Sequence, residues 1–386
     1  MYLLEHDAKV LLDAAGIAVP AGVLIESVAA LDGASLPPGP WVVKAQVPAG
    51  GRGKAGLVRM AETRAELPDL VGSMLGKTHR GHTVAACRIE RRSAAAHEAY
   101  LGFMLAPEEG GVRVLAAASG GIEVETSGGV ESKVVAADAQ ALAQAVRELA
   151  ARSPEPVRAA MIAASARLGA LFLARDAMLL EVNPLFVGRD GDFSAGDAKM
   201  VIDDNALGRQ PEVSALLAAR SHAYVETWLK AQHGFDYVVV DPQGELGLLT
   251  TGAGLSMMLI DELRASGIRP YNFLDVRTGG LRGDASRLVK VLGWIAQGPN
   301  VKCVLVNVFA GITHLGEFSR LLVQALAQAP ALQVPVVTRL VGNGLEDARE
   351  VLGAAGIAVE PDLDAALALV RRALSQPAQT GTMPQS

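Results

Sequence analysis

Alternating residue types mark a β-strand at residues 41–47, the most informative pattern in the chain. Trp41, Val43, Ala45 and Val47 occupy every second position, and Lys44 lies among the positions between them. A period of two is typical of a strand whose two faces differ. The predicted strand therefore carries a lysine directly into the segment that follows it.

A basic, glycine-rich loop follows this strand. Residues 48–56 contain four glycines together with Arg52 and Lys54. Glycine permits positive φ and a close approach of the backbone to a ligand, and Lys44, Arg52 and Lys54 supply positive charge. This combination predicts a clamp for a triphosphate. A β-hairpin with a basic, flexible tip would have the same composition, and the glycines alone do not separate the two.

The rest of the N-terminal half mixes helices and strands without strict alternation, as in α+β folds. Apolar residues recur at helical spacing from Leu4 to Ala15, and Gly16 supplies a stop. Further helices are predicted at 62–76 and 138–175, and Pro154 and Pro156 break the second of them. Further strands are predicted at 84–91 and 178–187. A turn at 188–192 follows, with a return strand that ends near Lys199.

Strands and helices alternate regularly after His233. The predicted strands are 247–251, 272–276, 302–309, 334–340 and 357–360, and helical patterns include 255–264, 285–296 and 363–374. Such alternation indicates a parallel, doubly wound sheet, whose ligands bind at the carboxyl ends of the strands. We place the domain boundary between residues 235 and 236, and we expect a disordered tail over 376–386.

Composition narrows the class of protein. Of the 386 residues, 50% are hydrophobic and 20% are charged, and the net charge is −6. These values indicate a folded, soluble protein and argue against nucleic-acid or anionic-membrane partners. No apolar run approaches the roughly 20 residues of a membrane span, and the acidic start has no signal-peptide pattern. Cys87 and Cys303 lie in apolar segments, so we expect buried thiols in a reducing, cytoplasmic compartment.

Oxygen-bearing side chains gather in the predicted hairpin near residue 190. Glu181 and Asn183 are two residues apart on one strand, and the return strand carries Asp197. A hairpin would bring Asn183 close to Asp197, and such oxygen ligands on rigid strands suit Mg²⁺. The alternative is a solvated hairpin with ordinary polar residues.

A charged run begins at the end of the predicted strand at 84–91. It contains Arg88, Glu90 and Ser93, with Glu98 a little further along the chain. Carboxylates and a hydroxyl at a strand end suit contacts to an adenine or a ribose. A charged outer surface would look the same.

Two glycine-containing turns in the C-terminal half each follow a strand and open a helix. They are 250–254 and 309–313. Free N–H groups at a helix start make an anion site. Two such turns at one sheet edge fit a carboxylate or phosphate site, although glycines in one such turn can also serve packing alone.

The order of these elements resembles the β subunit of succinate–CoA ligase (succinyl-CoA synthetase) and its malate–CoA ligase relatives, over residues 1 to 375. The motifs that carry the resemblance are WVVKAQVPAGGRGKAG at 41–56, EAYLG at 98–102, EVNPL at 181–185, GDAKMVIDDNAL at 196–207, GAGLSMM at 252–258, NFLDV at 272–276 and VLVNVFAGI at 304–312.

This resemblance implies an ATP-grasp nucleotide-binding domain over residues 1–235 and a flavodoxin-like CoA-ligase domain over 236–375. Carried over by motif, the implied nucleotide-binding residues are Lys44, Gly51, Arg52, Gly53, Glu90, Ser93 and Glu98. The implied Mg²⁺ ligands are Asn183 and Asp197, and Glu181 matches the glutamate near the phosphohistidine. The implied substrate-binding residues are Thr251, Arg277, Gly311, Ile312 and Thr313.

The implied reaction is ADP-forming ligation of a small di- or hydroxycarboxylic acid to coenzyme A. It proceeds through an acyl phosphate and a phosphohistidine, with ATP and CoA as substrates. In the family, a separate α subunit carries that histidine and binds CoA. None of this chain's seven histidines has the glycine-rich setting of a phosphorylated histidine, and His314, the nearest candidate, is interpreted as a loop residue.

Departures from the family pattern cluster in the C-terminal half. The family pattern Asn-Gly-Ala-Gly has Thr251 in place of its asparagine in this chain. The family turn Phe-Gly-Gly-Ile corresponds to residues 309–312, where Ala310 replaces the first glycine, as in the malate relatives. Arg277 stands at the first position of a segment that is three glycines in the family. Arg277 would pair with an extra carboxylate of the acid or point to solvent. Succinate is therefore not assured as the substrate. An ATP-grasp ligase joining an acid to an amine, and a nucleotide-binding regulatory paralogue, are the alternatives.

Overall fold

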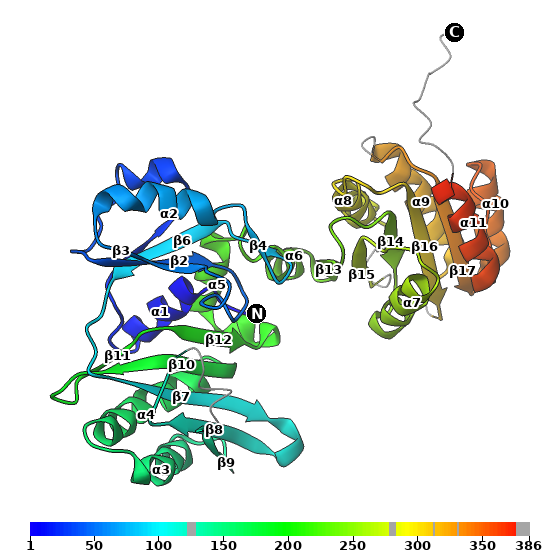
Figure 1. The fold of residues 1–386 in the computed structure, drawn as a ribbon. Coiled ribbons are helices and arrows are strands. Elements are labelled where there is room, and N and C mark those ends of the chain that lie inside the picture. Colours follow the sequence, from blue (N-terminus) through cyan, green and yellow to red (C-terminus); the bar gives the residue numbers. More distant parts are fainter. Residues whose placement is uncertain (122–128, 278–282, 312, 330–331, 376–386) are drawn as a thin grey trace. The chain divides into compact units, whose positions relative to one another are not determined.

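The protein is described by a computed structural model that covers residues 1–121, 129–277, 283–311, 313–329 and 332–375. It divides into two compact units, 1–223 and 224–386, which are treated separately below (Figure 1). The predicted domain boundary lies between α6 (Val225–His233) and β13 (Asp236–Val239), and this division puts α6 in the second unit. Ile312 and the predicted disordered tail over 376–386 lie outside the described residues.

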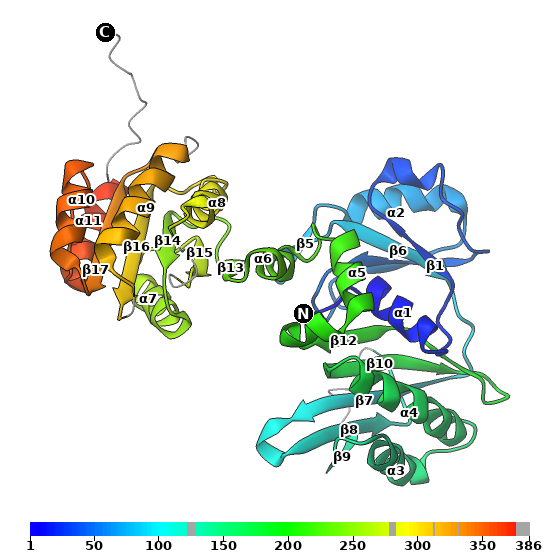
Figure 2. The same ribbon diagram turned by 180° about the vertical axis from the view of Figure 1, so that it is seen from behind.

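The first unit begins with an antiparallel sheet in the order β1-β6-β2-β3. Its strands are β1 (Gly22–Ile25), β2 (Trp41–Gln46), β3 (Val58–Ala61) and β6 (Ala86–Arg91). One face is apolar and packs on α2 (Leu67–Met74) through residues that include Val43, Ile89 and Val71. The other face turns toward α1 (Glu5–Ala14), which lies between the two sheets of this unit (Figures 1 and 2). The predicted strand at 41–47 and the helix ending before Gly16 are confirmed.

A second sheet completes this unit in the order β11-β10-β7-β8-β9, with β12 also paired to β10. Its strands are β7 (His97–Ala106), β8 (Gly111–Ala117), β9 (Glu131–Val135), β10 (Ala177–Val187), β11 (Phe193–Ala195) and β12 (Ala198–Ile202). The helices α3 (Ala139–Leu149) and α4 (Val157–Ala174) cover the face that lies away from α1 (Figures 1 and 2). Within the described residues, the other strands and α-helix of this unit are β4 (Thr78–His79), β5 (His82–Thr83) and α5 (Pro211–Ala219).

The predicted hairpin around residue 190 is confirmed, but its return strand is interrupted. Leu185 pairs with Ala195 and Val182 with Ala198, so the segment between β11 and β12 leaves the ladder. Asp197 lies in this break, and the register of β10 against β7 shifts between Val182 and Leu185. The two irregularities place Asn183 and Asp197 at the same level of the sheet.

Helix α4 is long and apolar. By length and composition alone it could cross a membrane, yet half of it is buried inside the unit. Its buried residues, among them Met161, Leu168 and Phe172, pack toward α3 and the second sheet, and the Phe172 ring lies 6.0 Å from that of Phe103 in β7. Its apolar composition is therefore accounted for by packing within the sheet-and-helix core.

The second unit is built on parallel strands in the order β14-β16-β17. These are β14 (Leu246–Thr250), β16 (Cys303–Ala310) and β17 (Val336–Gly342). One face packs on α8 (Ser286–Ile295), α9 (Leu315–Gln328) and α10 (Leu345–Ala354), and the other on α7 (Ala253–Ala265) and α11 (Leu363–Ser375). The alternation of strands and helices therefore produces the predicted doubly wound sheet.

Two predicted strands of this unit join the sheet differently from the rest. β15 (Asn272–Asp275) pairs antiparallel with β13, and it meets β14 through the Asn272 side chain, whose amide exchanges hydrogen bonds of 2.9 and 2.8 Å with the Leu248 backbone. The predicted strand at 357–360 is reduced to one bridge between Thr338 and Val359.

The thiols of Cys87 in β6 and Cys303 in β16 are free and buried, as predicted. Burial raises the pKa of both thiols to about 12, so they are uncharged packing groups.

Candidate functional site

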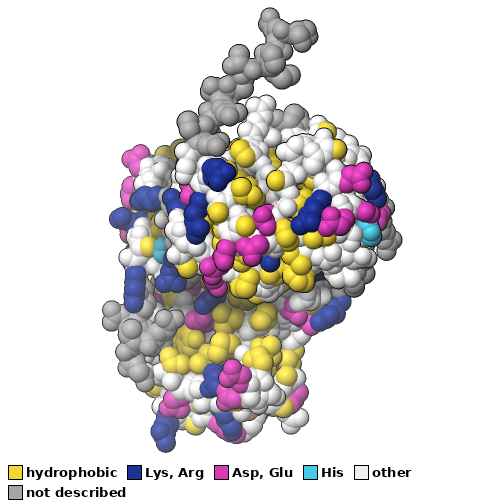
Figure 3. Space-filling model, turned by 90° about the vertical axis from the view of Figure 1, so that its right-hand side faces the viewer, with side chains coloured by type: hydrophobic (Ala, Val, Ile, Leu, Met, Phe, Trp, Pro, Cys, Tyr) yellow, Lys and Arg dark blue, Asp and Glu magenta, His cyan; other side chains and the backbone are white. Residues whose placement is uncertain are grey.

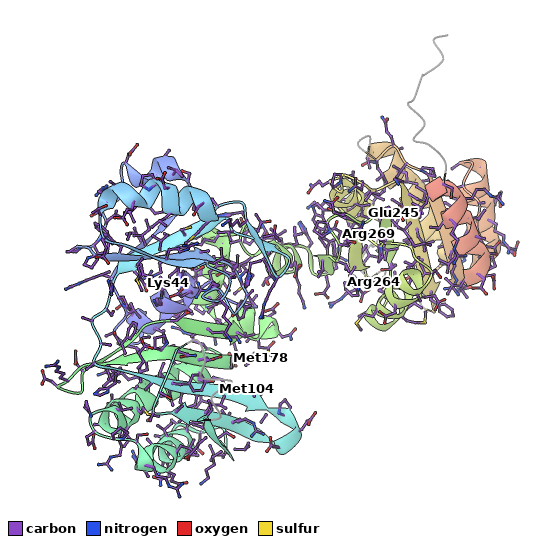
Figure 4. All side chains as sticks on the ribbon, in the orientation of Figure 1. Lys44, Met104, Met178, Glu245, Arg264 and Arg269 are labelled. Carbon is purple, nitrogen blue, oxygen red and sulfur yellow. The ribbon has the colours of Figure 1, made fainter. Side chains whose placement is uncertain are left out.

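Lys44 projects from β2 into the interior between β2 and α1 (Figure 4). Its Nζ lies 2.8 Å from Glu5 Oε1, 2.7 Å from Glu90 Oε1 and 2.6 Å from the Gly196 carbonyl oxygen. The side chain is only 10% exposed. The lysine of the predicted strand thus faces the interior, and the strand is buried on both faces because a polar cluster, rather than solvent, covers the second one.

Helix α1 supplies two further charges to this cluster. Glu5 and Lys9 are one helical turn apart, each with a side chain 1% exposed, and Lys9 Nζ lies 2.8 Å from Glu5 Oε1. Lys9 Nζ also donates to Glu90 Oε2 at 2.7 Å and to the Gly196 carbonyl at 2.8 Å. Burial alone would raise the pKa of Glu5, but Lys44, Lys9 and Arg52 together hold it well below its ordinary value. Glu5 is therefore a fixed negative charge.

Arg52 brings the glycine-rich loop into the same cluster. Its NH1 lies 2.7 Å from Glu5 Oε2 and donates to the Ala45 carbonyl at 3.0 Å. Its NH2 donates to both carboxylate oxygens of Asp197, at 2.8 and 2.9 Å. Residues 47–57 thus form a loop anchored on its own strand, on α1 and on the second sheet. Within it, Gly51 has a φ of 80°, which favours glycine at that position.

The predicted nucleotide residue Glu90 lies in the same interior, beside Arg88. Arg88 Nε donates to Glu90 Oε2 at 2.7 Å, and its NH1 lies 2.8 Å from His6 Nδ1. The charged-surface interpretation is therefore wrong for Arg88 and Glu90, which are 3% and 2% exposed, and holds for Arg91 and Arg92. The physical reason is mutual compensation, since the Glu90 carboxylate contacts Arg88, Lys9 and Lys44.

Asn183 and Glu98 form a second group. Asn183 Oδ1 accepts a hydrogen bond from the Gly121 backbone N–H at 2.7 Å, and its Nδ2 donates to the Gly121 carbonyl at 3.2 Å. A side-chain Cβ at Gly121 would lie 3.1 Å from Glu98 Oε2, so Glu98 reaches the same backbone segment from β7. Both predicted residues therefore flank the segment at Gly121.

The remaining predicted residues of the first unit have other surroundings. Glu181 faces Lys199 across the β10–β12 pair, with 3.7 Å between Oε2 and Nζ, and Lys199 Nζ lies 6.0 Å from the centre of the Tyr2 ring. Ser93 is half-buried in the segment after β6, and Gly53 is exposed in the loop.

The donor atoms of Asn183 and Asp197 suit Mg²⁺, which takes few protein ligands and keeps water or phosphate oxygens. The Asp197 side chain is 34% exposed, whereas those of Glu5 and Glu90 are almost fully buried. Among the carboxylates that contact Lys44 or Arg52, Asp197 is therefore the one that solvent and ions reach. Among the described residues, no group of three or more His, Cys, Asp or Glu side chains could hold a metal by itself. Such a pair of oxygen donors fits an ion that arrives with a nucleotide.

In the second unit, the two predicted turns lie at the same edge of the parallel sheet. Thr250 and Asn307 are paired in register near the ends of β14 and β16, and α7 and α9 start just beyond. Gly252 precedes α7 with a φ of 83°, and its N–H donates to Asp275 Oδ1 at 2.9 Å. The Thr251 hydroxyl is buried and has no hydrogen-bond partner among the described residues.

The other predicted residues of this unit have different surroundings. Gly311 is exposed, Thr313 is half-buried, and Ile312 lies outside the described residues. His314 immediately precedes α9, with its Nε2 3.7 Å from Asp347 Oδ2. Arg277 adopts a φ of 49°, and its guanidinium lies 3.3 Å from Asp236 Oδ2 on β13. The structure thus directs Arg277 toward an acidic side chain of the same unit.

Sequence reasoning missed Glu5 and Lys9, and it named Arg88 only as part of a charged run. The signal in α1 was present, because Glu5 and Lys9 have the (i, i+4) spacing of a helical ion pair within an otherwise apolar helix face. The glycine-rich loop pointed to Arg52 as a phosphate contact, but no local pattern showed its pairing with Glu5, which is far away in sequence.

Two protein-family models match the chain. One, described as an ATP-grasp domain, matches residues 2–187, and the other, described as CoA-ligase, matches residues 249–373. The first covers the residues of the buried cluster except Gly196 and Asp197. The second begins on β14 and covers the turns before α7 and α9.

Curated relatives match nearly the whole chain. Succinate–CoA ligase (ADP-forming) subunit beta of Chloroflexus aurantiacus is 36% identical over 363 residues, covering 91% of this chain and 93% of that protein. The chain belongs to the succinate–CoA ligase β-subunit family. The protein of the same name from Halorhodospira halophila is 34% identical, and the match covers 95% of this chain and 96% of that protein. That from Ignicoccus hospitalis, also 34% identical, covers 95% and 97%.

The β-subunit chain also resembles a solved structure over its length. ATP citrate lyase from Methanothrix soehngenii, in complex with citrate and coenzyme A, matches with a TM-score of 0.74 and 19% identity. The match covers 96% of this chain and 99% of that one. At this identity the likeness concerns the fold, and it supports the order of the two units of the β-subunit chain.

Proposed function

We propose that this chain is the nucleotide- and acid-binding subunit of an ADP-forming acid–CoA ligase, acting on a small di- or hydroxycarboxylic acid. Its partner would be an α subunit that carries the phosphohistidine and the CoA site. The curated relatives are named as subunits beta of succinate–CoA ligase, which supports both the reaction class and a heteromeric assembly.

The observation that carries the proposal is the buried clamp formed by Lys44 and Arg52 beside Asp197. Both cations extend from the strand and loop of the predicted triphosphate clamp, and both are fixed by hydrogen bonds before any ligand arrives. Phosphoryl transfer depends mainly on alignment and on neutralisation of charge. A pre-positioned lysine and arginine supply both.

Within this proposal, the clamp residues and the two candidate Mg²⁺ ligands of the first unit have defined roles. Lys44 and Arg52 contact phosphate oxygens, and the loop around Gly51 lets backbone N–H groups approach the same phosphates. Asn183 and Asp197 would hold Mg²⁺, which would offset the negative charge that develops during transfer. Because Asp197 pairs with Arg52 in this structure, holding the ion requires it to share or leave that contact.

The second unit would receive the acid at the carboxyl edge of its parallel sheet. The Thr251 hydroxyl, which has no hydrogen-bond partner among the described residues, and the helix starts at α7 and α9 are suited to bind a carboxylate. Overall, the acid, ATP and CoA would give the acyl-CoA, ADP and phosphate. The phosphoryl group would pass from ATP through the partner's histidine to the acid, forming an acyl phosphate. The CoA sulfur would then attack the acyl carbon and release phosphate.

Substitution of the clamp tests this proposal. We expect Lys44→Ala and Asp197→Ala each to reduce MgATP-dependent phosphorylation of the partner α subunit by at least about 100-fold, because each removes a charge-assisted contact to the transferring group. The measurement is ³²P transfer from labelled ATP in the purified complex. Full phosphorylation in both variants would show that these residues do not form the nucleotide site.

A panel of acids tests the substrate class. ADP release is measured with the complex and with this chain alone, in the presence of CoA and succinate, malate, citrate, itaconate or glutarate. Activity in the complex that requires one of these acids would identify the substrate. Amide formation by this chain alone, without CoA, would contradict the ligase assignment.

A further inference from the structure

The carboxylate of Glu5 is the common contact of the two clamp cations. Lys44 Nζ donates to Glu5 Oε1 at 2.8 Å, and Arg52 NH1 lies 2.7 Å from Glu5 Oε2. The two oxygens of one side chain thus contact a cation from the strand and a cation from the loop. Glu5 is almost completely buried, so its carboxylate is shielded from solvent and mobile ions.

Lys9 contacts the same oxygen of this carboxylate as Lys44 does. Its Nζ lies 2.8 Å from Glu5 Oε1 and reaches the Gly196 carbonyl, which Lys44 also contacts. Glu5 and Lys9 are both held by the α1 backbone, one helical turn apart. The helix therefore presents a rigid acceptor to cations that come from a strand and from a loop.

We propose that Glu5 is a positioning residue for nucleotide chemistry: it holds the Lys44 ammonium and the Arg52 guanidinium in the relative orientation that the triphosphate requires. This inference rests on the proposed function for the identity of the ligand, and on the contacts above for the role itself. Glu5 remains on the cations when the nucleotide binds, whereas the more exposed Asp197 is the carboxylate that becomes available to the metal and phosphates.

The Glu5→Gln substitution separates this role from simple packing. Glutamine has the same shape, but its amide has one acceptor oxygen and one donor NH₂ group. Three cations surround the native carboxylate, so in Glu5→Gln at least one of them faces a donor. The matched control is Asp7→Asn. Asp7 lies on the same helix, is fully buried, and pairs at 2.5 Å with Arg220 instead of the clamp.

The first readout uses this chain alone and does not depend on enzyme activity. Lysine acetylation by sulfosuccinimidyl acetate is followed by mass spectrometry, with the exposed Lys54 of the same loop as internal reference. We expect the Lys44-to-Lys54 labelling ratio to rise at least about fivefold in Glu5→Gln, because the loss of an anionic partner frees the amine. In Asp7→Asn it should stay within about twofold of wild type. An unchanged ratio in Glu5→Gln would overturn the proposal.

The second readout is phosphorylation of the partner subunit in the purified complex. We expect Glu5→Gln to lower kcat at saturating MgATP at least about tenfold while the KM for MgATP changes less than about threefold. The reason is that Lys44 and Arg52 keep their positive charges but lose their fixed orientation. Equal losses of kcat in Glu5→Gln and Asp7→Asn would mean that Glu5 only stabilises the fold, and would refute a positioning role. If the wild-type complex transfers no phosphate, the proposed function fails, and Lys44 labelling still decides the role of Glu5.

Discussion

At the level of single residues, Lys44 and Arg52 differ in how they are held. Lys44 is enclosed by Glu5, Glu90 and a carbonyl, all deeply buried, whereas Arg52 contacts both a buried carboxylate and the more exposed Asp197. Removing one partner of a buried pair leaves the other charge uncompensated, which is costly. Single substitutions in this cluster therefore affect folding and ligand binding together, and each test needs a control for folding.

The single residue His6 makes the folding stability of the first unit sensitive to acid. Burial, together with the charges of Arg88 and Arg220, lowers the pKa of His6 to about 4. Between about pH 6.5 and 4 the unfolded chain binds a proton here that the folded chain does not, so stability falls as the pH falls. The low pKa values of Glu5 and Glu90 add stability that is lost at still lower pH.

We expect His6→Asn to flatten this dependence. The asparagine carbonyl keeps an acceptor for Arg88 NH1 but does not titrate. Between pH 7 and pH 5, the wild type should lose roughly 1 kcal/mol more unfolding free energy than the variant, a value reduced for the partial exposure of the ring. Urea unfolding at several pH values measures this difference. Identical pH slopes for the two proteins would show that folding does not lower the pKa of His6.

At the level of elements, local patterns predicted more than long-range pairs did. The strand at β2, the helix stop at Gly16 and the alternation after His233 each follow from neighbouring residues, so the sequence was sufficient for them. The pairing of Glu5 with Lys44 and Arg52 joins segments 39 and more residues apart in sequence, and it depends on how α1 packs between two sheets. The break between β11 and β12 likewise arises from strand register, which no local pattern shows.

Helix α3 offers a test of an element that is remote from the buried cluster. Asp138 precedes the helix, and its Oδ1 accepts hydrogen bonds from the N–H groups of Gln140 and Ala141 at 3.0 and 2.9 Å. We expect Asp138→Ala to lower the unfolding free energy of the first unit by about 1 kcal/mol through loss of this cap. Denaturant unfolding measures it, with the exposed Gln140→Ala as the matched control.

Phosphorylation kinetics should remain unchanged in Asp138→Ala, because α3 covers the face of the second sheet that lies away from α1 (Figure 2). A stability equal to that of wild type would show that the cap contributes nothing.

At the level of the whole molecule, the chain contains two units with separate apolar cores. Residues such as Val43 and Ile89 form a core in the first unit, and Val306 and Leu322 belong to one in the second. Figure 3 shows acidic and basic side chains interspersed over the face it presents, in keeping with the modest net charge of −6. Each unit therefore has its own source of stability, and the two can respond differently to ligands and substitutions.

We expect calorimetry to resolve an unfolding transition for each unit. MgATP at 100 times its dissociation constant should stabilise the first unit by about 2.7 kcal/mol, because only the folded clamp binds it. Leu322→Ala, at a fully buried position of α9, should destabilise the second unit by about 2–5 kcal/mol without shifting the first transition. A single transition that moves as a whole in both experiments would contradict this independence.

The pairing of each clamp cation with a carboxylate has a consequence for how the protein responds to dissolved salt. Four cations (Lys9, Lys44, Arg52 and Arg88) and three carboxylates (Glu5, Glu90 and Asp197) make up the cluster, so it is close to neutral as a whole. Mobile ions screen exposed charges far more than enclosed ones. Nucleotide affinity should therefore change little between dilute buffer and physiological ionic strength, and selectivity would come from the directions of a few hydrogen bonds rather than from long-range attraction.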